Sequence, residues 1–576
     1  MDNTWTLTDR IKGYTTDLDK TRTPEETIRD VKSRFAALDL DILSEIVRID
    51  NGRLDIPVFF SVCGADARRL TGTTKQMGKG ATPAQAEASA IMELVERFSF
   101  YAYYRNENNF TAAPYSRIKD NGALPLDMIA ASVNDQSNDR DIALSLFAEE
   151  PMKWAKGFNL SREEPVWVPF DWFFAINEFN GTSSGNCLEE ALCQGICEVV
   201  ERHVCDVISR HRLPVDSIDP DSTRDAIVAG LIGKYRKNNI DLYISDFSLD
   251  MGIPTVGVLA HDPATFPEKS ELVWTAGTMT APEKALNRAL TEVAQLAGDF
   301  NSGANFVASG LPKYRRLSEA GYITHPDSIK PIHGLPDVSH ENIKVEVERL
   351  IAALAGKNME VIVVDTTYKG LALPALYTMV PGTCFRERAA AGSVGLFTAK
   401  RVTEKYPPHE ALTRLEAFDR RLPGKYYIQF YMGRMELAMN HPEKALAHFH
   451  RAIDMEPDGQ DLPAVYSYMG VCLKDMAQYR EALDVLKKAE ELDDERTDVY
   501  NLAGFCHFRL KEHGEAVRAF ERVIQLNPSS AIDYANIGVN YREMGETDKA
   551  IEYFRTALQI DPGIGFARES LERLVS

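Results

Sequence analysis

Residues 93–97 read Glu93-Leu94-Val95-Glu96-Arg97, and the same pattern, Glu-x-x-Glu-Arg, returns as Glu198-Val199-Val200-Glu201-Arg202. Each copy stands in an apolar helical pattern behind a glycine-rich stretch. Residues three or four apart share one face of a helix, so each copy presents two carboxylates and one guanidinium together. Such groups rarely lie in an apolar helix unless they are paired or bind an ion. Two of these helices facing one another would suit Mg²⁺ and a polyphosphate.

A third helical pattern resembles the first two. It carries Arg288, Glu292 and Gln295 at spacings of four and three, and Glu190 and Gln194 precede the second copy on its own stripe. For a single Glu-x-x-Glu-Arg, the simpler alternative is a solvated helix face with an internal ion pair. Two copies behind glycine-rich stretches, together with the third helix, favour a binding site over that alternative.

The stretch in front of the first copy, residues 71–85, contains the signals of a helix start. Thr82 fits the N-cap, Pro83 fits the first helical position, and Gln85 fits the last position of a capping box. The glycines of the stretch would let phosphates approach the positive end of the helix. The spacing of these glycines and the residue after the lysine both differ from a P-loop.

Length, composition and charge limit the classes to which the protein can belong. The 576 residues exceed one core and suggest roughly two to four domains. The formal charge of −20 argues against a nucleic-acid or anionic-membrane surface. No apolar stretch is as long as a membrane span, and the first residues lack the features of a signal peptide. We therefore expect a cytoplasmic protein without a nucleic-acid or membrane partner.

Eight cysteines are too few for a disulfide scaffold in a chain of this length. Four of them gather in one helical segment: Cys187, Cys193, Cys197 and Cys205. Their spacing matches no common zinc motif, which favours small apolar residues on a buried helix face. A metal or redox role stays open as the alternative.

The last quarter of the chain repeats with a step of 34 residues. The recurring positions are Gly470, Gly504 and Gly538; Ala482, Ala516 and Ala550; Phe520 and Phe554; Pro528 and Pro562. An earlier copy, ahead of a three-residue insertion near 458–460, carries Gly433, Ala445, Phe449 and Pro457. This period, with small residues where helices cross, resembles the tetratricopeptide repeat.

The repeat pattern predicts about four repeats over residues 424–564 and a capping helix over 563–576. The concave face of such a superhelix would bind a protein or peptide. The alternative is that the repeats only brace the rest of the chain or form a homodimer. Both interpretations stay open.

Residues 1–405 alternate between strand-like and helix-like segments, which predicts an α+β or α/β domain with helices layered on sheet. A charged, less periodic segment then predicts a linker at 406–423, before the all-α repeat domain at 424–576. Runs rich in β-branched residues predict strands at 56–62, 240–245, 255–260, 272–276 and 361–364. Apolar periodicity predicts helices at 83–104, 187–209, 282–298 and 342–355.

Four segments closely resemble the YcaO-domain family: Gly78-Lys79-Gly80-Ala81-Thr82, Ser89-x-x-x-Glu93-x-x-Glu96-Arg97, Gly181-Thr182-Ser183-Ser184-Gly185-Asn186 and Glu198-x-x-Glu201-Arg202. The stretch 20–27 is similar to that family's N-terminal strip, and the resemblance covers nearly all of residues 15–400. It implies an α+β YcaO-type domain that binds ATP and Mg²⁺, followed here by the repeat superhelix. Family members use ATP to activate a peptide-backbone amide and form azolines or thioamides, and some assist ribosomal-protein methylthiolation.

Carried over residue by residue, the resemblance implies a ligand set for the metal and the phosphates. Phosphate contacts would come from Arg202 and Arg288, which together with Glu201 would be the catalytic groups. Hard oxygen ligands suit Mg²⁺, and its ligands would be Glu93, Glu96, Glu198 and Glu201.

The resemblance also implies which residues surround the rest of the nucleotide. Asn186 and Glu190 would hold the adenosine side, and Ser89, Lys20 and Arg22 would lie near the nucleotide. Asn186 has an alternative role, because it could serve as the N-cap of the helix that follows.

The implied reaction begins when a nucleophile adds to the amide carbonyl. The resulting oxyanion attacks the γ-phosphate of ATP, and loss of phosphate completes the dehydration. A Cys, Ser or Thr side chain as nucleophile gives an azoline, and external sulfide gives a thioamide.

Two departures from the family pattern bear on the product. The third helix continues as Gln295-Leu296-Ala297-Gly298-Asp299, where an arginine is expected soon after the glutamine, so one substrate or phosphate contact lacks its residue. The end, residues 572–576, lacks the proline-rich tail of azoline-forming members. We therefore expect thioamidation or an accessory role, with the repeats presenting a protein substrate or a sulfur-donating partner. The alternative is a non-catalytic adaptor whose ATP site regulates assembly.

Overall fold

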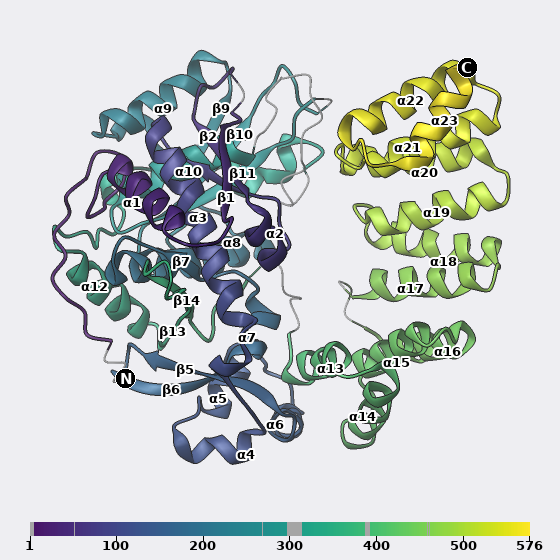
Figure 1. The fold of residues 1–576 in the computed structure, drawn as a ribbon, viewed down its shortest axis with the longest axis horizontal. Coiled ribbons are helices and arrows are strands. Elements are labelled where there is room, and N and C mark those ends of the chain that lie inside the picture. The colour runs from purple at the N-terminus through teal and green to yellow at the C-terminus, as the bar shows by residue number, and fades with distance from the viewer. Residues whose placement is uncertain are drawn as a thin grey trace. The chain divides into compact units, whose positions relative to one another are not determined.

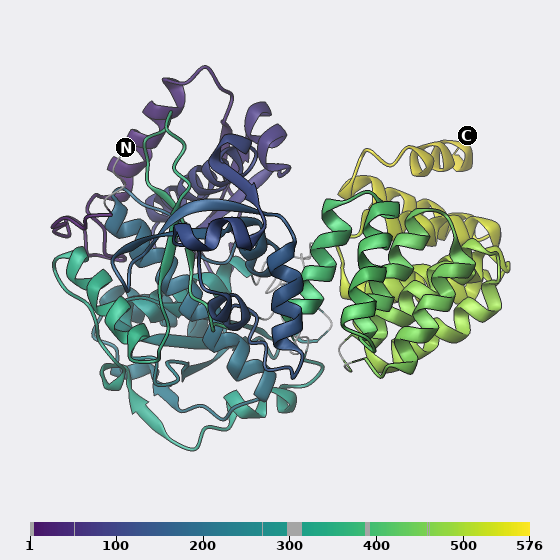
Figure 2. The same ribbon diagram turned by 90° about the horizontal axis from the view of Figure 1, so that it is seen from below.

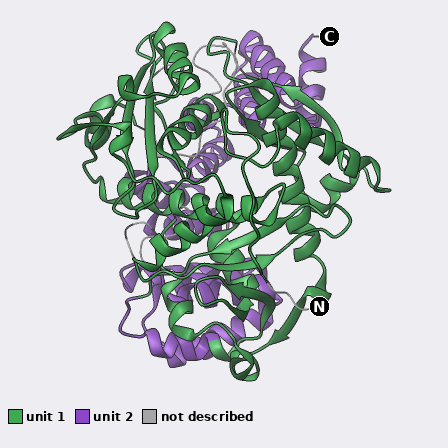
Figure 3. Ribbon diagram, turned by 90° about the vertical axis from the view of Figure 1, so that its left-hand side faces the viewer, with its two compact units in different colours: residues 1–135, 148–304, 309–388 green, residues 136–147, 305–308, 389–576 purple. Residues whose placement is uncertain are grey.

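The computed structural model describes residues 5–50, 52–267, 269–296, 314–385, 392–457, 459 and 461–575. These residues form two compact units (Figure 3). The first unit comprises the described residues of 1–135, 148–304 and 309–388. The second unit comprises the described residues of 136–147 and 389–576.

The described strands of the first unit form three sheets (Figure 1). The first is antiparallel and runs in the order β1(Leu43–Arg48), β2(Val58–Cys63), β3(Lys75–Lys79). The second has the order β11(Val273–Thr278), β10(Thr255–His261), β9(Asp241–Asp246), β8(Ser217–Asp219), β12(Ile329–Pro331), with only β8 and β12 parallel. The third has the order β4(Phe110–Ala113), β5(Met152–Asn159), β13(Ile362–Asp365), β14(Ala375–Met379), β7(Thr182–Ser184), and β6(Glu164–Pro169) also pairs with β5.

Three long helices lie between these sheets. Helix α3(Pro83–Tyr104) packs on β3 of the first sheet and on β7 and β14 of the third. Helix α8(Leu188–His211) packs on β7 and β14 and on β11 of the second sheet. Helix α10(Pro282–Leu296) packs on β11 and returns to β3. Each of the three helices therefore bridges two of the three sheets in turn.

Shorter helices complete the first unit. They are α1(Pro24–Ala36), α2(Ala65–Thr71), α4(Tyr115–Ile118), α5(Leu126–Ala131), α7(Phe170–Asn177), α9(Ala226–Lys237), α11(Gly321–Thr324) and α12(Ile343–Ala355). Helix α6(Arg140–Glu149) begins in the second unit, which contains its residues 140–147. None of the described helices is both long enough and apolar enough to cross a membrane.

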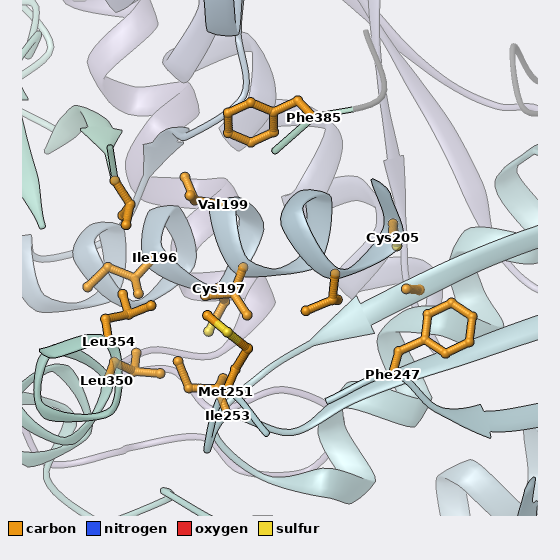
Figure 4. Packing of buried hydrophobic residues seen from close by; sticks show 14 of the residues in the cluster. Ile196, Cys197, Val199, Cys205, Phe247, Met251, Ile253, Leu350, Leu354 and Phe385 are labelled. Atoms are coloured by element: carbon orange, nitrogen blue, oxygen red, sulfur yellow. The ribbon is translucent and has the colours of Figure 1, made fainter. Parts of the chain in front are cut away.

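One apolar core of the first unit surrounds α8 (Figure 4). Cys197 and Cys205 are buried there against side chains such as Phe247 and Leu350. Hydrogen bonding to Cys197, together with burial, raises the pKa of the Cys193 thiol well above its ordinary value. Cys197 and Cys205 thus pack as small apolar residues in this core, with Cys193 against it, while Cys187, the fourth of the group, is the N-cap of α8.

The second unit consists of helices stacked in antiparallel pairs (Figures 1 and 2). Its members are α13(Val394–Lys405), α14(Pro408–Arg421), α15(Tyr426–Ala438), α16(Pro442–Asp454), α17(Leu462–Asp475), α18(Tyr479–Leu492), α19(Thr497–Arg509), α20(His513–Leu526), α21(Ala531–Glu543), α22(Thr547–Ile560) and α23(Gly565–Val575). The helix pairs from α15 to α22 occupy the span expected for the four repeats, and α23 lies where the capping helix was expected.

The recurring glycines of the repeats lie where paired helices cross. A Cβ on Gly504 would stand 2.7 Å from the ring of Phe520, and a Cβ on Gly538 would stand 2.9 Å from the ring of Phe554. Only a residue without a side chain lets the aromatic ring of the second helix approach so closely. The 34-residue period is therefore the period of these helix crossings.

The structure corrects the linker expected at 406–423. Residues 408–421 form α14, whose N-terminal Pro408 and buried Ala411, Leu415 and Phe418 follow the helical period. The second unit also includes α13, which ends at Lys405. The helical unit thus begins before the expected boundary.

Two further expectations about the start of α3 need correction. Thr82 is the N-cap and accepts a hydrogen bond from the backbone N–H of Gln85, but the Gln85 amide accepts from the N–H of Ala81, not of Thr82. Within the stretch 71–85, which was expected to be a glycine-rich loop before the helix, residues 75–79 form strand β3. A Cβ on Gly78 would stand 2.0 Å from the backbone nitrogen of Ala90, so this glycine permits close packing of β3 on α3.

Candidate functional site

Three strand–helix pairs build the centre of the first unit: β3 with α3, β7 with α8, and β11 with α10. The first and third pairs share one packing detail. A Cβ on Gly277 would stand 2.2 Å from the carbonyl oxygen of Ala285 and 2.6 Å from the nitrogen of Ala289, and Gly78 meets Ala86 and Ala90 in the same way. The pairs therefore bring equivalent helix positions to equivalent places.

Counting from the first residue of each helix shows which residues are equivalent. One position holds Glu93, Glu198 and Glu292, and the next position on the stripe holds Glu96, Glu201 and Gln295. The preceding position on the stripe holds Ser89, Gln194 and Arg288. The two Glu-x-x-Glu-Arg patterns and the third helix are thus three versions of one arrangement.

A cavity of about 330 Å³ opens between these helices and the N-terminal segment. This volume lies in the range of small-molecule sites. All the residues assigned to the site from the sequence line it except Glu201: Lys20, Arg22, Ser89, Glu93, Glu96, Asn186, Glu190, Glu198, Arg202 and Arg288. The tertiary structure therefore gathers residues that lie up to 268 positions apart (Lys20 to Arg288).

Glu201 lies behind the cavity wall, with 1% of its surface exposed. Its Oε2 accepts hydrogen bonds from the backbone N–H of Thr278 at 2.9 Å and from Nε of Arg288 at 3.1 Å. Its Oε1 is buried and has no hydrogen-bond partner among the described residues. In this arrangement Glu201 orients Arg288 across the junction of α8 and α10.

The first Glu-x-x-Glu-Arg pattern forms a connected polar group. Arg97 lies 3.6 Å from Glu96 and 3.7 Å from Glu93, and it donates a hydrogen bond to the hydroxyl of Thr182 at 3.1 Å. Thr182 in turn donates to Glu96 at 2.5 Å. The Arg97 guanidinium also stacks on the ring of Phe179 at 4.4 Å. The role assignment from the sequence omitted Arg97, although the pattern contains it.

Burial controls the charge of the cavity walls. It raises the pKa of Glu198 to about 8 and raises the pKa of Glu93. Burial works against the charge of Arg202 and Arg288, but nearby carboxylates, first among them Glu201, raise the pKa of both arginines. Both guanidiniums therefore remain cations at the cavity.

A further ion pair, missed by the sequence assignment, joins Lys79 of β3 to Glu292 of α10. Burial opposes ionisation of Glu292, but the charges of Lys79, Arg288 and Arg202 lower its pKa to about 2. Lys79 itself could have been noticed in the sequence, because Gly78-Lys79-Gly80 places a lysine shortly before α3. Its partner Glu292 lies 213 positions further along the chain, and no local sequence pattern predicts that the two side chains meet.

The N-terminal segment is held at the cavity by the start of α8. The backbone N–H and the hydroxyl of Thr21 both donate to Oε1 of Glu190 at 2.6 Å. Asn186 donates to Oε2 of Glu190 at 3.0 Å from its backbone and from its amide, and it accepts from the Thr27 hydroxyl. The N-cap of α8 is Cys187, so the N-cap alternative for Asn186 is wrong.

Glu189, which the sequence did not single out for the site, holds the segment further toward its start. It is 1% exposed and accepts hydrogen bonds from the N–H of Thr8 at 2.7 Å and from its hydroxyl at 2.9 Å. Arg10 adds a third contact at 3.4 Å. Consecutive carboxylates at the first turn of α8 are also favoured by the positive end of the helix.

The cavity suits an anionic ligand with a divalent cation. Nε of Arg202 is buried and has no hydrogen-bond partner among the described residues, so it can donate to an anion. Carboxylates such as Glu93, Glu96 and Glu198 on the same walls are hard oxygen donors of the kind that Mg²⁺ prefers. Within the described part of the chain, no three His, Cys, Asp or Glu side chains are close enough to hold a metal ion alone. A metal would therefore share its coordination with the ligand and water.

The family model that describes a "YcaO cyclodehydratase" binding ATP and Mg²⁺ matches residues 77–384. The chain belongs to the YcaO family. This confirms the resemblance seen in the sequence and, through the family's description, the expected cofactors ATP and Mg²⁺. Residues 495–562 match the tetratricopeptide repeat, which confirms the repeats and indicates protein–protein interaction. The predicted fold class, a mixed α and β domain followed by helical repeats, is confirmed as well.

Individual relatives of this YcaO protein are more distant. An uncharacterised protein of Methanothermobacter thermautotrophicus is 28% identical over 62% of this chain and 93% of its own. An uncharacterised protein from the tfuA 3′ region of Rhizobium leguminosarum bv. trifolii is 24% identical over 63% of this chain and 88% of its own.

Two solved structures share the fold of the YcaO domain. One is YcaO from Methanopyrus kandleri bound with AMPPCP and Mg²⁺, with a TM-score of 0.51 at 24% identity, over 66% of this chain and 95% of the other. The other is a heterocyclase in complex with substrate and cofactor, with a TM-score of 0.55 at 22% identity, over 66% of this chain. This chain spans about half of that heterocyclase, 54% of its length.

Proposed function

We propose that this YcaO protein uses ATP and Mg²⁺ to activate a backbone amide of a protein or peptide. The observation that supports it most is the cavity where α3, α8 and α10 present carboxylates and the buried Arg202 side by side. Such a mixture of hard oxygen ligands and cations suits a metal-bound polyphosphate. The family's description and the nucleotide analogue in the Methanopyrus kandleri protein agree with that use.

Each wall of the cavity has its own role in this proposal. Glu93, Glu96 and Glu198 would hold Mg²⁺, which would supply positive charge to offset that of the phosphates. Arg202 and Arg288 contact phosphate oxygens, and Glu201 acts on them through Arg288. Because Glu201 already accepts two hydrogen bonds behind the wall, we propose it as a positioning residue, not as a metal ligand.

The N-terminal segment closes the nucleotide end of the cavity. Asn186 and Glu190 orient Lys20 and Arg22 by holding the backbone at Thr21, and Ser89 faces the same space from α3. The family resemblance implies that Asn186 and Glu190 both hold the adenosine part of ATP. Since Glu190 is 1% exposed and already accepts four hydrogen bonds, we propose that it supports the segment while Asn186 remains available to the nucleoside.

The proposed reaction is amide activation by phosphorylation. A nucleophile adds to the carbonyl carbon, and the oxyanion takes the γ-phosphoryl group of ATP, which releases ADP. Loss of phosphate then removes the original oxygen from the carbon. With sulfide as the nucleophile, the carbon–oxygen double bond becomes carbon–sulfur and the product is a thioamide. The other use included in this proposal is an accessory role in ribosomal-protein methylthiolation.

A second candidate is a non-catalytic adaptor that binds ATP and recruits a partner through its repeats. The observation in its favour is that the repeats lie in the second compact unit and that residues 495–562 match the tetratricopeptide repeat. In this case nucleotide binding would change partner affinity without chemical change in any partner.

A binding titration separates these proposals from a site that takes no nucleotide. Calorimetry of ATP with Mg²⁺ should show saturable binding to the wild type and a loss on the order of 10- to 100-fold in Glu198→Gln. The matched control is Glu87→Gln. Glu87 lies on α3 outside the cavity and pairs with Lys32, so this variant should bind ATP as the wild type does.

Turnover distinguishes the enzyme from the adaptor. Proteins captured with the repeats would be incubated with ATP, Mg²⁺ and sulfide, and their peptides analysed by mass spectrometry. Exchange of oxygen for sulfur, or loss of water, coupled to ADP formation supports amide activation. Nucleotide-dependent capture without any mass change would favour the adaptor.

A further inference from the structure

The first helices of successive repeats lie next to one another in the second unit. Helix α17 contacts both α15 and α19, and one second helix separates each of them from the next along the chain (Figure 1). Gly433 of α15 and Gly504 of α19 face their second helices, where aromatic rings lie against them. Arg434 and Phe505 directly follow these glycines, so they occupy the same position on the first helices. Phe505 is 37% exposed there, which shows that the second helices do not cover this face.

Two cations flank the exposed ring of Phe505. The ammonium of Lys474 on α17 lies 5.9 Å from the ring centre, and the guanidinium of Arg509 on α19 lies 5.7 Å from it. Arg509 also lies 5.0 Å from the ring centre of Tyr479, which meets Phe505 edge to face. An exposed ring between two cations suits a ligand that brings both an apolar side chain and negative charge.

A third cation lies further along the same face. The guanidinium of Arg434 lies over the ring of Tyr468 on α17, 5.5 Å from its centre. Tyr468 precedes Lys474 by six residues on α17, which corresponds to about 9 Å of helix. Arg434 and the cations around Phe505 are therefore separated by roughly three residues of extended chain. We call Arg434, Tyr468, Lys474, Phe505 and Arg509 the first-helix surface.

The carboxylates of α15, α17 and α19 do not neutralise the two arginines of this surface. Each of these carboxylates has a basic neighbour of its own: Glu436 pairs with His441, Asp475 with Lys474, and Asp498 with Arg496. Among the residues that the structure describes, no ion pair joins Arg434 or Arg509 to a carboxylate. In a chain with a formal charge of −20, the first-helix surface is thus a local cationic site.

We propose that Arg434, Lys474 and Arg509 bind an acidic segment of a partner protein, which places an apolar side chain on Phe505. This inference extends the partner role proposed for the repeats by naming the chemistry of the segment, and it applies to the enzyme and to the adaptor alike. The segment is extended and has carboxylates about three residues apart, because that spacing matches the separation of the cations.

The two kinds of cation contribute differently to this binding. Each arginine can hold a carboxylate with two parallel N–H groups, so Arg434 and Arg509 fix the register of the segment. Lys474 exchanges its pair with Asp475, which is partly exposed and therefore weak, for a carboxylate of the segment. The negative charge of the rest of the chain repels an acidic segment elsewhere, which confines it to the first-helix surface.

The chain supplies a matched control for each type of side chain. Arg555 of α22 is exposed and has no ion pair within the described part of the chain, but it lies on a second helix. Phe566 of α23 is 41% exposed and lies outside the first helices. Arg555→Gln and Phe566→Ala therefore remove the same groups as Arg509→Gln and Phe505→Ala, away from the first-helix surface.

The test measures the binding of two pools of short, fluorescein-labelled peptides to the full chain by fluorescence anisotropy. The acidic pool has Asp or Glu at every third position and apolar residues between, and the amide pool has Asn or Gln in place of the acids. The wild type should bind the acidic pool at least about 10-fold more tightly than the amide pool. Binding of the acidic pool should also weaken as the salt concentration rises.

The variants should separate the charges from the apolar contact. Arg509→Gln should weaken the acidic pool on the order of 10-fold, the double variant with Arg434→Gln should weaken it further, and Arg509→Lys should retain part of the affinity. Phe505→Ala should weaken both pools, because the ring contact is independent of charge. The two control variants should bind both pools as the wild type does.

Equal binding of the two pools by the wild type would overturn the proposal, as would unchanged binding of the acidic pool by Arg509→Gln and the double variant. A loss in Arg555→Gln as large as in Arg509→Gln would show unspecific charge attraction and overturn it too. Arg509 is exposed, so its substitution should leave the unfolding temperature unchanged. Calorimetry with ATP keeps the two proposals apart: a wild type that binds the acidic pool but no ATP would overturn the ATP-dependent function alone.

Discussion

Arg288 of α10 donates a hydrogen bond from Nε to Oε2 of Glu201 on α8, over 3.1 Å. The carboxylate is 1% exposed and also accepts the backbone N–H of Thr278 at the end of β11. A buried acid on one helix thus orients a cavity arginine on the next. Charge-assisted hydrogen bonds of this kind are short and directional, so the position of Arg288 depends on Glu201.

Substitution of Glu201 should act through Arg288. Glu201→Ala leaves the N–H of Thr278 and the guanidinium without their buried acceptor, and should lower the free energy of unfolding by about 3–5 kcal/mol. Glu201→Gln keeps an acceptor and should lower ATP affinity several-fold with a much smaller loss of stability. Thermal unfolding and calorimetry with varied Mg²⁺ check this. A Glu201→Gln variant with unchanged stability and abolished Mg²⁺ dependence would instead make Glu201 a metal ligand.

Glu189 should control the N-terminal segment. Glu189→Gln removes the charge that holds Thr8 and Arg10, so the segment should open more often and ATP affinity should fall several-fold. Limited trypsin digestion read by mass spectrometry should show faster cleavage after Arg10 and Lys12 in the variant. Glu87→Gln should digest as the wild type does. Unchanged cleavage in Glu189→Gln would show that other contacts, such as Lys12 with Asp19 and Glu346, hold the segment without Glu189.

His448 should make the repeat unit sensitive to mild acid. Burial, and then the charge of Arg451, lower the pKa of His448 to about 4 from its ordinary 6.5, so the folded state prefers the neutral ring. The unfolded chain takes up a proton first as pH falls, and stability is lost from about pH 6.5 down to about pH 4. The loss should be about 1–3 kcal/mol.

The check for His448 is a comparison of the wild type with His448→Gln by calorimetric unfolding of the full chain at pH 7.5 and pH 5. The wild type should have the higher free energy of unfolding at pH 7.5. The difference between the two proteins should become smaller at pH 5, because only the wild type loses stability when the unfolded chain takes up a proton at His448. An advantage that is the same at both pH values would contradict the assignment.

The helix crossings of the repeats should tolerate no side chain at the recurring glycines. Gly504→Ala places a Cβ 2.7 Å from the ring of Phe520 and should destabilise the repeat unit by about 1–3 kcal/mol. Gly514 lies in α20 with nothing within 4 Å of a new Cβ, so Gly514→Ala should stabilise by about 0.5–1 kcal/mol. Unfolding temperatures of the two variants should therefore move in opposite directions. A shift of the same sign in both would show that the crossing can relax.

Much of the local structure followed from the sequence, for reasons that can be named. The helix expected at 83–104 is α3 with the same bounds, because Thr82 and Pro83 start it and apolar periodicity runs through it. The strands expected at 255–260 and 272–276 appear as β10 and β11. The third helix was expected to reach 298, and α10 is described to Leu296. The described residues do not include Ala297, Gly298 and Asp299, where the family pattern would have an arginine. They also do not include residues 458 and 460 of the repeat insertion.

The errors share one cause. The glycines before α3 were interpreted as parts of a loop because a sequence shows only that glycine is present. The contact of Gly78 with Ala90, which requires glycine, exists only after β3 has packed on α3. The linker expected at 406–423 was wrong for a similar reason. The weak apolar stripe of α14 is sufficient for a helix once Ala411 and Leu415 are buried by neighbouring helices.

The sequence by itself indicated the family, the cofactors, the repeat period and most of the residues that line the cavity, because patterns of a few residues and a constant step of 34 are local properties of the chain. The tertiary structure alone decided that Glu201 lies behind the wall, that Lys79 meets Glu292 and that Glu189 and Glu190 hold the N-terminal segment. Each of these pairs side chains from segments more than 70 residues apart. Such partners are chosen by how sheets and helices pack around a buried cavity, where an ionised group persists only if the fold brings it a partner.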